Sequence, residues 1–267
     1  MPKKDSVAVL GPKGTFTEEA AKKMFPGRAL WHCDTVEEVF DSVDAGMEYG
    51  VVAIENSLEG PVNTTMDCLV EYGVCISAEQ ILDIHLCLMA PHGTNKAGIK
   101  TILSHSHSFG QCRKYIKKNY PKASLKRYDS NAAAIKELAE QKPPGVAAIG
   151  PEAAARLYGL ETISCGIEDA PSQTRFVAVS KKKSTKGRKT SVIFVLKDRP
   201  GALFQALKDY ADNGINLTKI ESRPAKKKLG EYSFYVDFIG CLDDPAVIKT
   251  LASLKEKTSF LKTLGSY

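Results

Sequence analysis

Residues 51–67 read VVAIENSLEGPVNTTMD, an apolar run followed by a dense group of amides, hydroxyls and glycine. The β-branched run Val51–Ile54 predicts a buried strand. The carboxyl end of a buried strand is where open α/β sheets bind their ligands. We therefore predict a binding loop that includes Glu55, Asn56 and Ser57, with a solvated surface loop as the alternative.

Similar apolar runs recur on both sides of this stretch and alternate with helical segments. Helices are predicted to begin at Thr15 and Thr35, because each threonine precedes a glutamate by three residues in a capping box. An alanine-rich helix is predicted over Asn131–Glu140. This alternation predicts mainly parallel sheets covered by helices on both faces. The other predicted strands are Val7–Leu10, Ile99–Leu103, Val146–Ile149 and Phe176–Val179.

Two extended segments are predicted to connect separate parts of this region. Ile81–Ala90 is predicted to lead from one lobe to another, and the closing strand Arg175–Val179 to lead back. We therefore expect two α/β lobes, roughly 1–80 with 165–180 and 81–164. A cleft between two lobes is a common place for a ligand site.

The basic excess of the chain is confined to one segment. The formal net charge is +6, and residues 181–189, KKKSTKGRK, contain six Lys or Arg and no acid, so the remainder sums to zero. Like charges with Gly and Ser extend such a segment, so we place a domain linker at 181–190. A solvated hinge is favoured over its alternative, a nucleic-acid contact, and no nucleic-acid partner is predicted.

The region from 191 to 267 has a different pattern. Its predicted order is βαββαβ, a ferredoxin-like sandwich. A turn at Asp198–Gly201 precedes its first helix, a charged loop covers Pro224–Gly230, and Asp244-Pro245 begins its second helix with proline at the first position. A single small sheet leaves an edge that commonly pairs with another copy, so a homodimer or homotetramer is expected.

Cysteine and histidine usage indicates neither a disulfide framework nor a metal centre. Seven scattered cysteines with no C-x-x-C spacing are typical of small buried thiols in a reducing compartment. His105 and His107 are the one close histidine pair, and their spacing is weak for a metal. Apolar runs fall short of a membrane span and no leader is evident, so we predict a cytoplasmic protein without metal, cofactor or membrane partner.

Three further segments have residue types suited to an anion. Gly11–Phe16 joins a strand to a helix whose free N–H groups suit a carboxylate or phosphate, a plain turn being the alternative. Ser104–Cys112 also opens a helix, although its hydroxyls are equally suited to capping. Arg175 lies between a hydroxyl and an aromatic residue and suits a planar carboxylate, whereas a lone arginine is usually a surface ion-pair partner.

These segments together resemble the prephenate dehydratase family, in the family's order and over nearly the whole chain. The chain departs from the pattern in two places: Ser106-His107 stands where Pro-Gln is usual, and Ser172 stands where Asn is common. The matching motifs are Gly11–Thr17, Glu55–Val62, Ser104–Cys112 and Thr174–Phe176, followed by Gly201–Leu203 and Glu221–Pro224 of an ACT domain.

The resemblance implies a fold, a reaction and a site. The fold is a two-lobed, type II periplasmic-binding-protein-like α/β domain over 1–180 and a ferredoxin-like ACT domain over 191–267. The enzyme is a monofunctional lyase without cofactor that converts prephenate to phenylpyruvate, carbon dioxide and water. Thr174 donates to the departing oxygen or relays a proton through a solvent molecule, Arg175 holds the pyruvyl carboxylate, and Glu55 and His105 are candidate acids. The implied substrate-binding residues are Thr15, Glu55, Asn56, Ser57, Ser104, His105 and Phe176.

The resemblance also implies feedback inhibition by L-phenylalanine at the ACT domain, with a pure oligomerisation domain as the alternative. Two other functions stay open: the same chemistry on arogenate, and a non-catalytic two-lobe sensor. The implied effector residues are Gly201, Ala202, Leu203, Asn216, Glu221, Ser222, Arg223 and Pro224.

Overall fold

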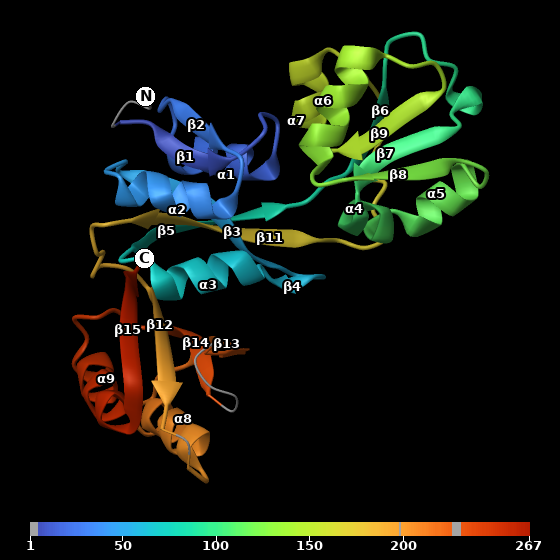
Figure 1. The fold of residues 1–267 in the computed structure, drawn as a ribbon. Helices are drawn as coiled ribbons and strands as arrows, with labels where there is room; N and C mark the ends of the chain where they lie inside the picture. The colour runs from blue at the N-terminus through green and yellow to red at the C-terminus, as the bar shows by residue number, and fades with distance from the viewer. Residues whose placement is uncertain (1–4, 198, 226–230) are drawn as a thin grey trace.

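The protein forms three β-sheets, two of them before residue 181 and one after it (Figure 1). The structure is a computed structural model that describes residues 5–197, 199–225 and 231–267. Asp198 of the predicted turn and residues 226–230 of the predicted charged loop lie outside the described residues. Within these ranges, no helix combines the length and the apolar character that crossing a bilayer requires.

The first lobe is built on a sheet in the order β2-β1-β3-β11-β5, with β4 paired to β3. β1 runs parallel to β2 and β3, but β11 runs antiparallel to both β3 and β5. The sheet is therefore mixed rather than mainly parallel, because β11 returns from the other lobe. Its elements are β1 (Val7–Leu10), α1 (Phe16–Met24), β2 (Leu30–Cys33), α2 (Val36–Asp44), β3 (Tyr49–Asn56), β4 (Gly60–Pro61), α3 (Asn63–Glu71), β5 (Cys75–Asp83) and β11 (Gln173–Ser180).

The second lobe has a sheet in the order β10-β6-β9-β7-β8, again mixed, since β6 pairs antiparallel with β9 and β10. The chain enters this lobe through residues 84–86 and leaves it through 166–172. Its elements are β6 (Cys87–Ala90), the 3₁₀ turn η1 (Lys96–Gly98), β7 (Thr101–His105), α4 (Ser106–Gln111), α5 (Arg113–Asn119), β8 (Ser124–Tyr128), α6 (Asn131–Gln141), β9 (Val146–Gly150), α7 (Glu152–Tyr158) and β10 (Glu161–Cys165).

Both predicted capping threonines begin their helices. Thr15 Oγ1 accepts the N–H of Glu18 at 3.1 Å, and Thr35 Oγ1 accepts the N–H of Glu38 at 3.1 Å. The carboxylate of Glu18 reaches back one residue further than a capping box requires and accepts the N–H of Gly14 at 2.8 Å. This bond stabilises the loop in front of α1, which borders the cleft described below.

The C-terminal region has the predicted βαββαβ order and a sheet in the order β13-β14-β12-β15. One face packs on the two helices, with Val236 and Phe238 against Tyr210. The other face is buried against the first lobe, where Tyr235 joins the same apolar cluster as Met66 (Figure 1). Its elements are β12 (Lys189–Leu196), α8 (Ala202–Asp212), β13 (Leu217–Pro224), β14 (Tyr232–Ile239), α9 (Pro245–Lys257) and β15 (Thr258–Ser266).

The basic segment between the two regions is not a purely solvated hinge. Lys181 pairs with Asp44 of α2, and Lys183 donates to Thr263 of β15. Lys189 already belongs to β12, so the connection is shorter than the predicted linker 181–190. Its cations are therefore partly used to hold the C-terminal region against the first lobe.

The prediction that all cysteines are free thiols is wrong for two of them. Cys87 and Cys165 form a disulfide, although 78 residues separate them in sequence. They lie opposite each other in the antiparallel pair β6–β10, a relationship that cysteine spacing does not reveal. The free cysteines are Cys33, Cys68, Cys75, Cys112 and Cys241.

Candidate active site between the two lobes

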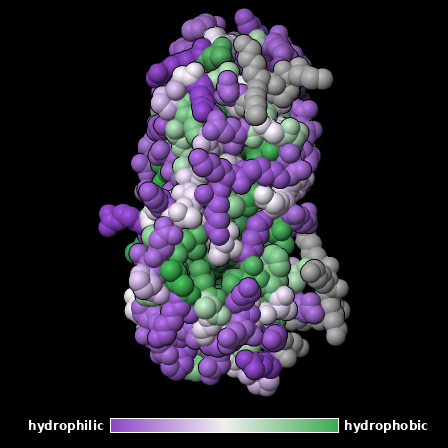
Figure 2. Space-filling model, turned by 90° about the vertical axis from the view of Figure 1, so that its left-hand side faces the viewer, coloured by the Kyte–Doolittle hydropathy of each residue, from purple (hydrophilic) through white to green (hydrophobic). Residues whose placement is uncertain are grey.

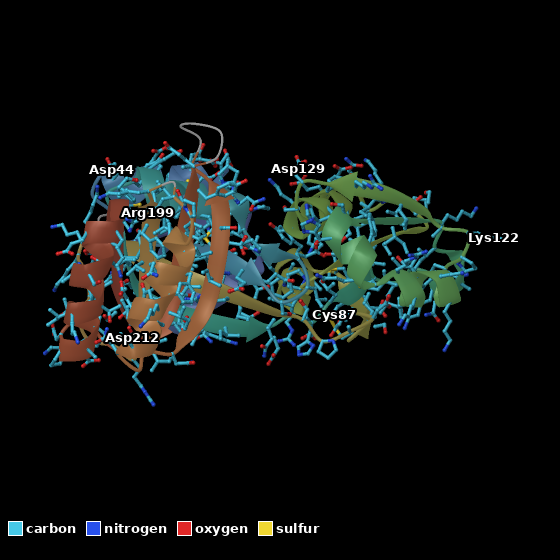
Figure 3. The ribbon with its side chains drawn as sticks, turned by 90° about the horizontal axis from the view of Figure 1, so that it is seen from below. Asp44, Cys87, Lys122, Asp129, Arg199 and Asp212 are labelled. Atoms are coloured by element: carbon cyan, nitrogen blue, oxygen red, sulfur yellow. A yellow bond between two sulfur atoms is a disulfide. The ribbon has the colours of Figure 1, made fainter. Side chains whose placement is uncertain are left out.

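Two adjoining cavities lie between the lobes, and both are lined by Phe16, His105, Asn131 and Thr174. The α1 cavity, of about 250 Å³, also takes in the start of α1 and the β8–α6 connection. The α3 cavity, of about 410 Å³, extends to residues 59–63 at the start of α3. We call the two together the cleft. Figure 3 shows Asp129, which lines the α1 cavity, on the side of the second lobe that faces the first, and Lys122 at its far end.

The hydroxyl of Thr174 is oriented by the side-chain amide of Asn56. Asn56 Oδ1 accepts the backbone N–H groups of Leu58 at 2.9 Å and Glu59 at 3.0 Å, which fixes that end of the amide as the oxygen. Its Nδ2 therefore donates to Thr174 Oγ1 at 2.9 Å and to Ser172 Oγ at 3.0 Å. Because Thr174 accepts this bond, its own proton remains available to a group in the cleft.

Asn131 is the matching amide on the opposite lobe, and the sequence-based site did not include it. Its Oδ1 accepts the N–H of His105 at 3.0 Å and the hydroxyl of Ser108 at 3.0 Å. A backbone N–H must face an oxygen, so the NH₂ end of Asn131 is the end left to face the cleft that it lines. The signal that could have identified it is its place at the start of a helix directly after strand β8.

Three helices of at least nine residues begin at the cleft. Their first turns supply the lining residues Phe16 of α1, Asn63 of α3 and Asn131 of α6. Free N–H groups and the helix dipole favour a negatively charged ligand at each of these ends. The cleft is thus suited to an anion that touches both lobes.

The cleft itself contains neither Lys nor Arg among the described lining residues. Its ionisable groups are Glu59, Asp129, His105 and His107. Burial and the neighbouring His107 lower the pKa of His105 from its usual 6.5. His105 Nδ1 accepts the N–H of His107 at 3.3 Å, so the neutral ring carries its proton on Nε2.

Several predicted site residues lie at the cleft: the substrate-binding candidates Thr15, Asn56, His105 and Phe176 line it, as does the catalytic candidate Thr174. Two others support these residues from behind. Ser57 Oγ accepts the N–H of Gln173 at 2.9 Å, next to Thr174 in β11, and Ser104 Oγ lies 2.9 Å from Asn131 Oδ1. Lining residues outside the predicted set include Glu59, Asn63, His107, Gln111, Asp129 and Asn131.

Arg175 and Glu55 do not line either cavity of the cleft, and the role predicted for Arg175, holding a substrate carboxylate, stays a prediction. Successive side chains of a strand point to opposite faces, so Thr174 and Phe176 line the cleft while Arg175 points to the C-terminal region. Its guanidinium donates to Glu79 at 2.7 Å and to Asp237 at 2.5 Å. Glu55 is likewise paired with Lys219, at 2.8 Å.

The predicted effector residues lie on two segments of the C-terminal region. Gly201, with φ of 75°, precedes Ala202 and Leu203 in the first turn of α8. Glu221, Ser222, Arg223 and Pro224 end β13, and the carbonyl of Asn216 accepts the N–H of Ile239 at 2.9 Å. Arg223 contacts the first lobe, where it donates to Asn63 Oδ1 and pairs with Asp67 at 3.1 Å. A shared effector site for these residues stays a prediction.

The fold and the cleft define a two-lobed α/β protein with a cleft suited to a small anion between its lobes and an appended ferredoxin-like domain. The family model for prephenate dehydratase matches residues 7–184, and the model for the ACT domain matches residues 190–256. The chain belongs to the prephenate dehydratase family. The predicted fold class, an α/β body with a C-terminal ACT domain, is confirmed.

Relatives cover almost the whole chain. A prephenate dehydratase of Methanocaldococcus jannaschii is 41% identical, over 96% of this chain and 95% of that protein. Arogenate dehydratase 2 of Petunia hybrida is 36% identical, over 98% of this chain and 71% of that protein.

Two solved structures have the same architecture. Prephenate dehydratase of Arthrobacter aurescens in complex with L-Phe has a TM-score of 0.90 and 35% identity, covering 97% of this chain and 89% of that one. GqqA, described as a novel type of quorum quenching acylase, has a TM-score of 0.89 and 27% identity, covering 97% of this chain and 96% of that one.

Proposed function

We propose that this chain removes water and carbon dioxide from prephenate to give phenylpyruvate. The observation that carries this proposal is the Thr174 hydroxyl, which accepts a bond from Asn56 and so has a free proton at the cleft. A hydroxyl is too weak an acid to ionise near neutrality, but it can donate a hydrogen bond to the ring oxygen that leaves as water. Thr174 is therefore the residue that assists departure of the C4 hydroxyl.

The absence of Lys and Arg from the described lining residues of the cleft fits loss of carbon dioxide from a dianion. A fixed cation on the departing carboxylate would stabilise the substrate more than the transition state, since that carboxylate loses its charge as the reaction proceeds. The starts of α1, α3 and α6, with the amide of Asn131, offer N–H donors to the carboxylates instead. The ring becomes aromatic, so the protein has mainly to orient the substrate and assist the leaving oxygen.

His105 is the candidate for a second donor. It lines both cavities, and its lowered pKa favours the neutral ring with a proton on Nε2. A neutral imidazole can donate a hydrogen bond to a substrate oxygen without placing a fixed cation on the departing carboxylate. Glu55, the other acid proposed from the sequence, is held by Lys219 and is not assigned a chemical role.

Arogenate is the second candidate substrate, because two carboxylates border the cleft. Arogenate carries an ammonium group where prephenate has a ketone, and Glu59 and Asp129 are the acidic groups that could receive it. The relative from Petunia is named for this substrate. The ratio of kcat/KM for the two compounds decides between them, and an Asp129→Asn or Glu59→Gln variant should selectively weaken arogenate if that assignment is correct.

Regulation by L-phenylalanine at the ACT domain is part of the proposal. The Arthrobacter relative, 35% identical, was solved with L-Phe. The C-terminal region also exposes several large apolar side chains, and Figure 2 shows apolar surface gathered on the lower half of the face it presents, where this region lies. These side chains support assembly into a homodimer or homotetramer, which we propose to act in the cytoplasm. They are Leu203, Phe204, Ile220, Tyr232, Ile239, Ile248 and Phe260.

The deciding experiment is a direct assay with the purified full chain. Phenylpyruvate formation is followed by absorbance after addition of prephenate, with and without L-phenylalanine, and in parallel with arogenate by formation of phenylalanine. We expect turnover of prephenate by the wild type and a loss of about 10²-fold in the Thr174→Ala variant. Absence of product from both substrates would leave the non-catalytic sensor as the function.

A further inference from the structure

The ACT domain contacts β3 and β11 on the side that faces away from the cleft. These two strands carry the active-site pair, Asn56 and Thr174. Thr174 and Asn56 are register partners in the β11–β3 pair, and the next pair of partners is Arg175 and Glu55. Thr174 and Asn56 meet on the cleft side. Arg175 and Glu55 meet charged residues of the ACT sheet on the other side. On each strand, the residue in the active-site contact is therefore adjacent in sequence to the residue that contacts the ACT domain.

The two facing rows of charge are complementary. Asp237 and Lys219 are register partners in the β14–β13 pair, as Arg175 and Glu55 are in the first lobe. Arg175 Nη1 lies 2.5 Å from Asp237 Oδ2, and Lys219 Nζ lies 2.8 Å from Glu55 Oε1. Positive Arg175 thus faces negative Asp237, while its negative neighbour Glu55 faces positive Lys219. Such a pattern fixes the register of one sheet on the other.

Arg175 and Asp237 are buried, and both make further hydrogen bonds besides the one that joins them. Glu79 accepts a bond from Arg175 Nε and also pairs with Lys189, while Tyr267 Oη accepts a bond from Arg175 Nη2. Asp237 is 6% exposed, and its second oxygen accepts the hydroxyl of Ser191. Arg175, Lys189 and Lys219 thus face Glu55, Glu79 and Asp237, three cations against three anions.

Balanced charges of this kind make the contact sensitive to removal of one partner. Neutralising Asp237 leaves the buried Arg175 guanidinium without one of its anionic partners, so the neighbouring strand has to shift or admit solvent. The strand concerned here carries Thr174, and a displacement of about 1 Å in a catalytic group can cost 10²-fold in rate.

We propose that Asp237 and Lys219 of the ACT domain are positioning residues that hold the Thr174–Asn56 pair in its active arrangement. This inference rests on the proposed function, and it assigns Arg175 a positioning role rather than substrate binding. It also gives a route for regulation: an effector that moves β13 or β14 moves the anchors of β11 and β3. Arg223, from one predicted effector segment, extends the same contact to Asn63 of the cleft lining.

The test compares Asp237→Asn and Lys219→Met with Asp209→Asn in the full chain. Asp209 is the matched control, since it pairs with Lys257 at 2.6 Å within the ACT domain, between α8 and α9. We expect Asp237→Asn to lower kcat by about tenfold to hundredfold, to change KM much less, and to weaken inhibition by L-phenylalanine. Asp209→Asn should leave all three near wild type.

A double variant separates positioning from substrate binding. If Asp237 acts through Arg175, then Arg175→Gln with Asp237→Asn is no slower than Arg175→Gln alone. If the two losses multiply, or if Asp237→Asn matches wild type, or if Asp209→Asn is equally impaired, the inference is overturned.

Amide hydrogen exchange gives a readout that does not depend on turnover. Peptides covering residues 172–177 should exchange faster in Asp237→Asn than in Asp209→Asn, because the strand has lost its anchor. A wild type that is inactive on prephenate and arogenate would refute the proposed function. In that case, unchanged exchange in Asp237→Asn would refute the anchoring as well, and faster exchange would support it.

Discussion

The side-chain amide of Asn56 donates to Thr174 Oγ1 at 2.9 Å while its oxygen receives the N–H groups of Leu58 and Glu59. This arrangement makes the direction of the Thr174 hydroxyl depend on which end of the residue-56 side chain faces it. Asn56→Asp replaces the donor with an acceptor, so the Thr174 proton should turn toward the introduced carboxylate and away from the substrate.

We therefore expect Asn56→Asp to lower kcat by about 10²-fold, as removal of a single transition-state donor does. Steady-state kinetics with prephenate measure the change. The control is the pair Thr174→Ala and Asn56→Asp combined, which should be no slower than Thr174→Ala alone, because Asn56 acts through that hydroxyl. A combined loss equal to the product of the two single losses would contradict this role.

Asn131 provides a second test, aimed at binding rather than at chemistry. Its Oδ1 accepts bonds from His105 and Ser108, and its NH₂ end faces the cleft. Asn131→Asp keeps an acceptor for both bonds but places a carboxylate oxygen toward a dianionic substrate. We expect KM for prephenate to rise by about tenfold or more, with Tm close to wild type, since like charges disfavour binding. An unchanged KM would remove Asn131 from the site.

Local sequence was sufficient for several of the elements and insufficient for the directions of side chains. Thr15 and Thr35 cap helices as predicted, because capping depends on residues three apart. Thr174 and Arg175 are adjacent in a motif, but strand geometry sends them to opposite faces. Which face is the cleft depends on where the lobes and the ACT domain pack, and residue spacing does not encode this.

The missed residue Asn131 illustrates the same limit. Its helix was predicted to begin at residue 131, and the structure starts α6 there. Its participation in the cleft arises because β8 lies beside β7, which brings the start of α6 to the start of α4. That adjacency joins segments about 25 residues apart and requires the sheet order, which follows from tertiary packing.

The Cys87–Cys165 disulfide determines how many thiols can be titrated before and after reduction. Under denaturing conditions without reductant, thiol titration of the wild type should find the five free cysteines, and after reduction all seven. Cys165→Ser should gain one titratable thiol without reductant, because it releases Cys87. Seven thiols before reduction, in protein purified without reductant, would show that the two cysteines are not bonded in solution.

Loss of this bond should also affect the base of the second lobe. Cys87 opens β6 just after the first passage between lobes, and Cys165 closes β10 just before the return (Figure 3 labels Cys87). A crosslink of this kind typically contributes about 2–4 kcal/mol by restricting the unfolded chain. Chemical denaturation of the wild type with and without reductant measures the difference, with Cys165→Ser as the variant that should show no response to reductant.

His105 predicts a dependence of stability on pH with a definite sign. Burial, with the nearby His107, lowers the folded-state pKa of His105 below its usual 6.5. Between the folded and unfolded pKa values the unfolded chain binds more protons, so the free energy of unfolding rises with pH through that window and is constant above it.

Acidification from pH 6.5 should therefore weaken the wild type more than His105→Gln, whose side chain does not titrate. Urea denaturation at a series of pH values between about 5 and 8 measures this difference, which spans the range in which histidine changes charge. Parallel curves for the two proteins would mean that His105 titrates equally in the folded and unfolded states, and its neutral ring could then not be attributed to the cleft.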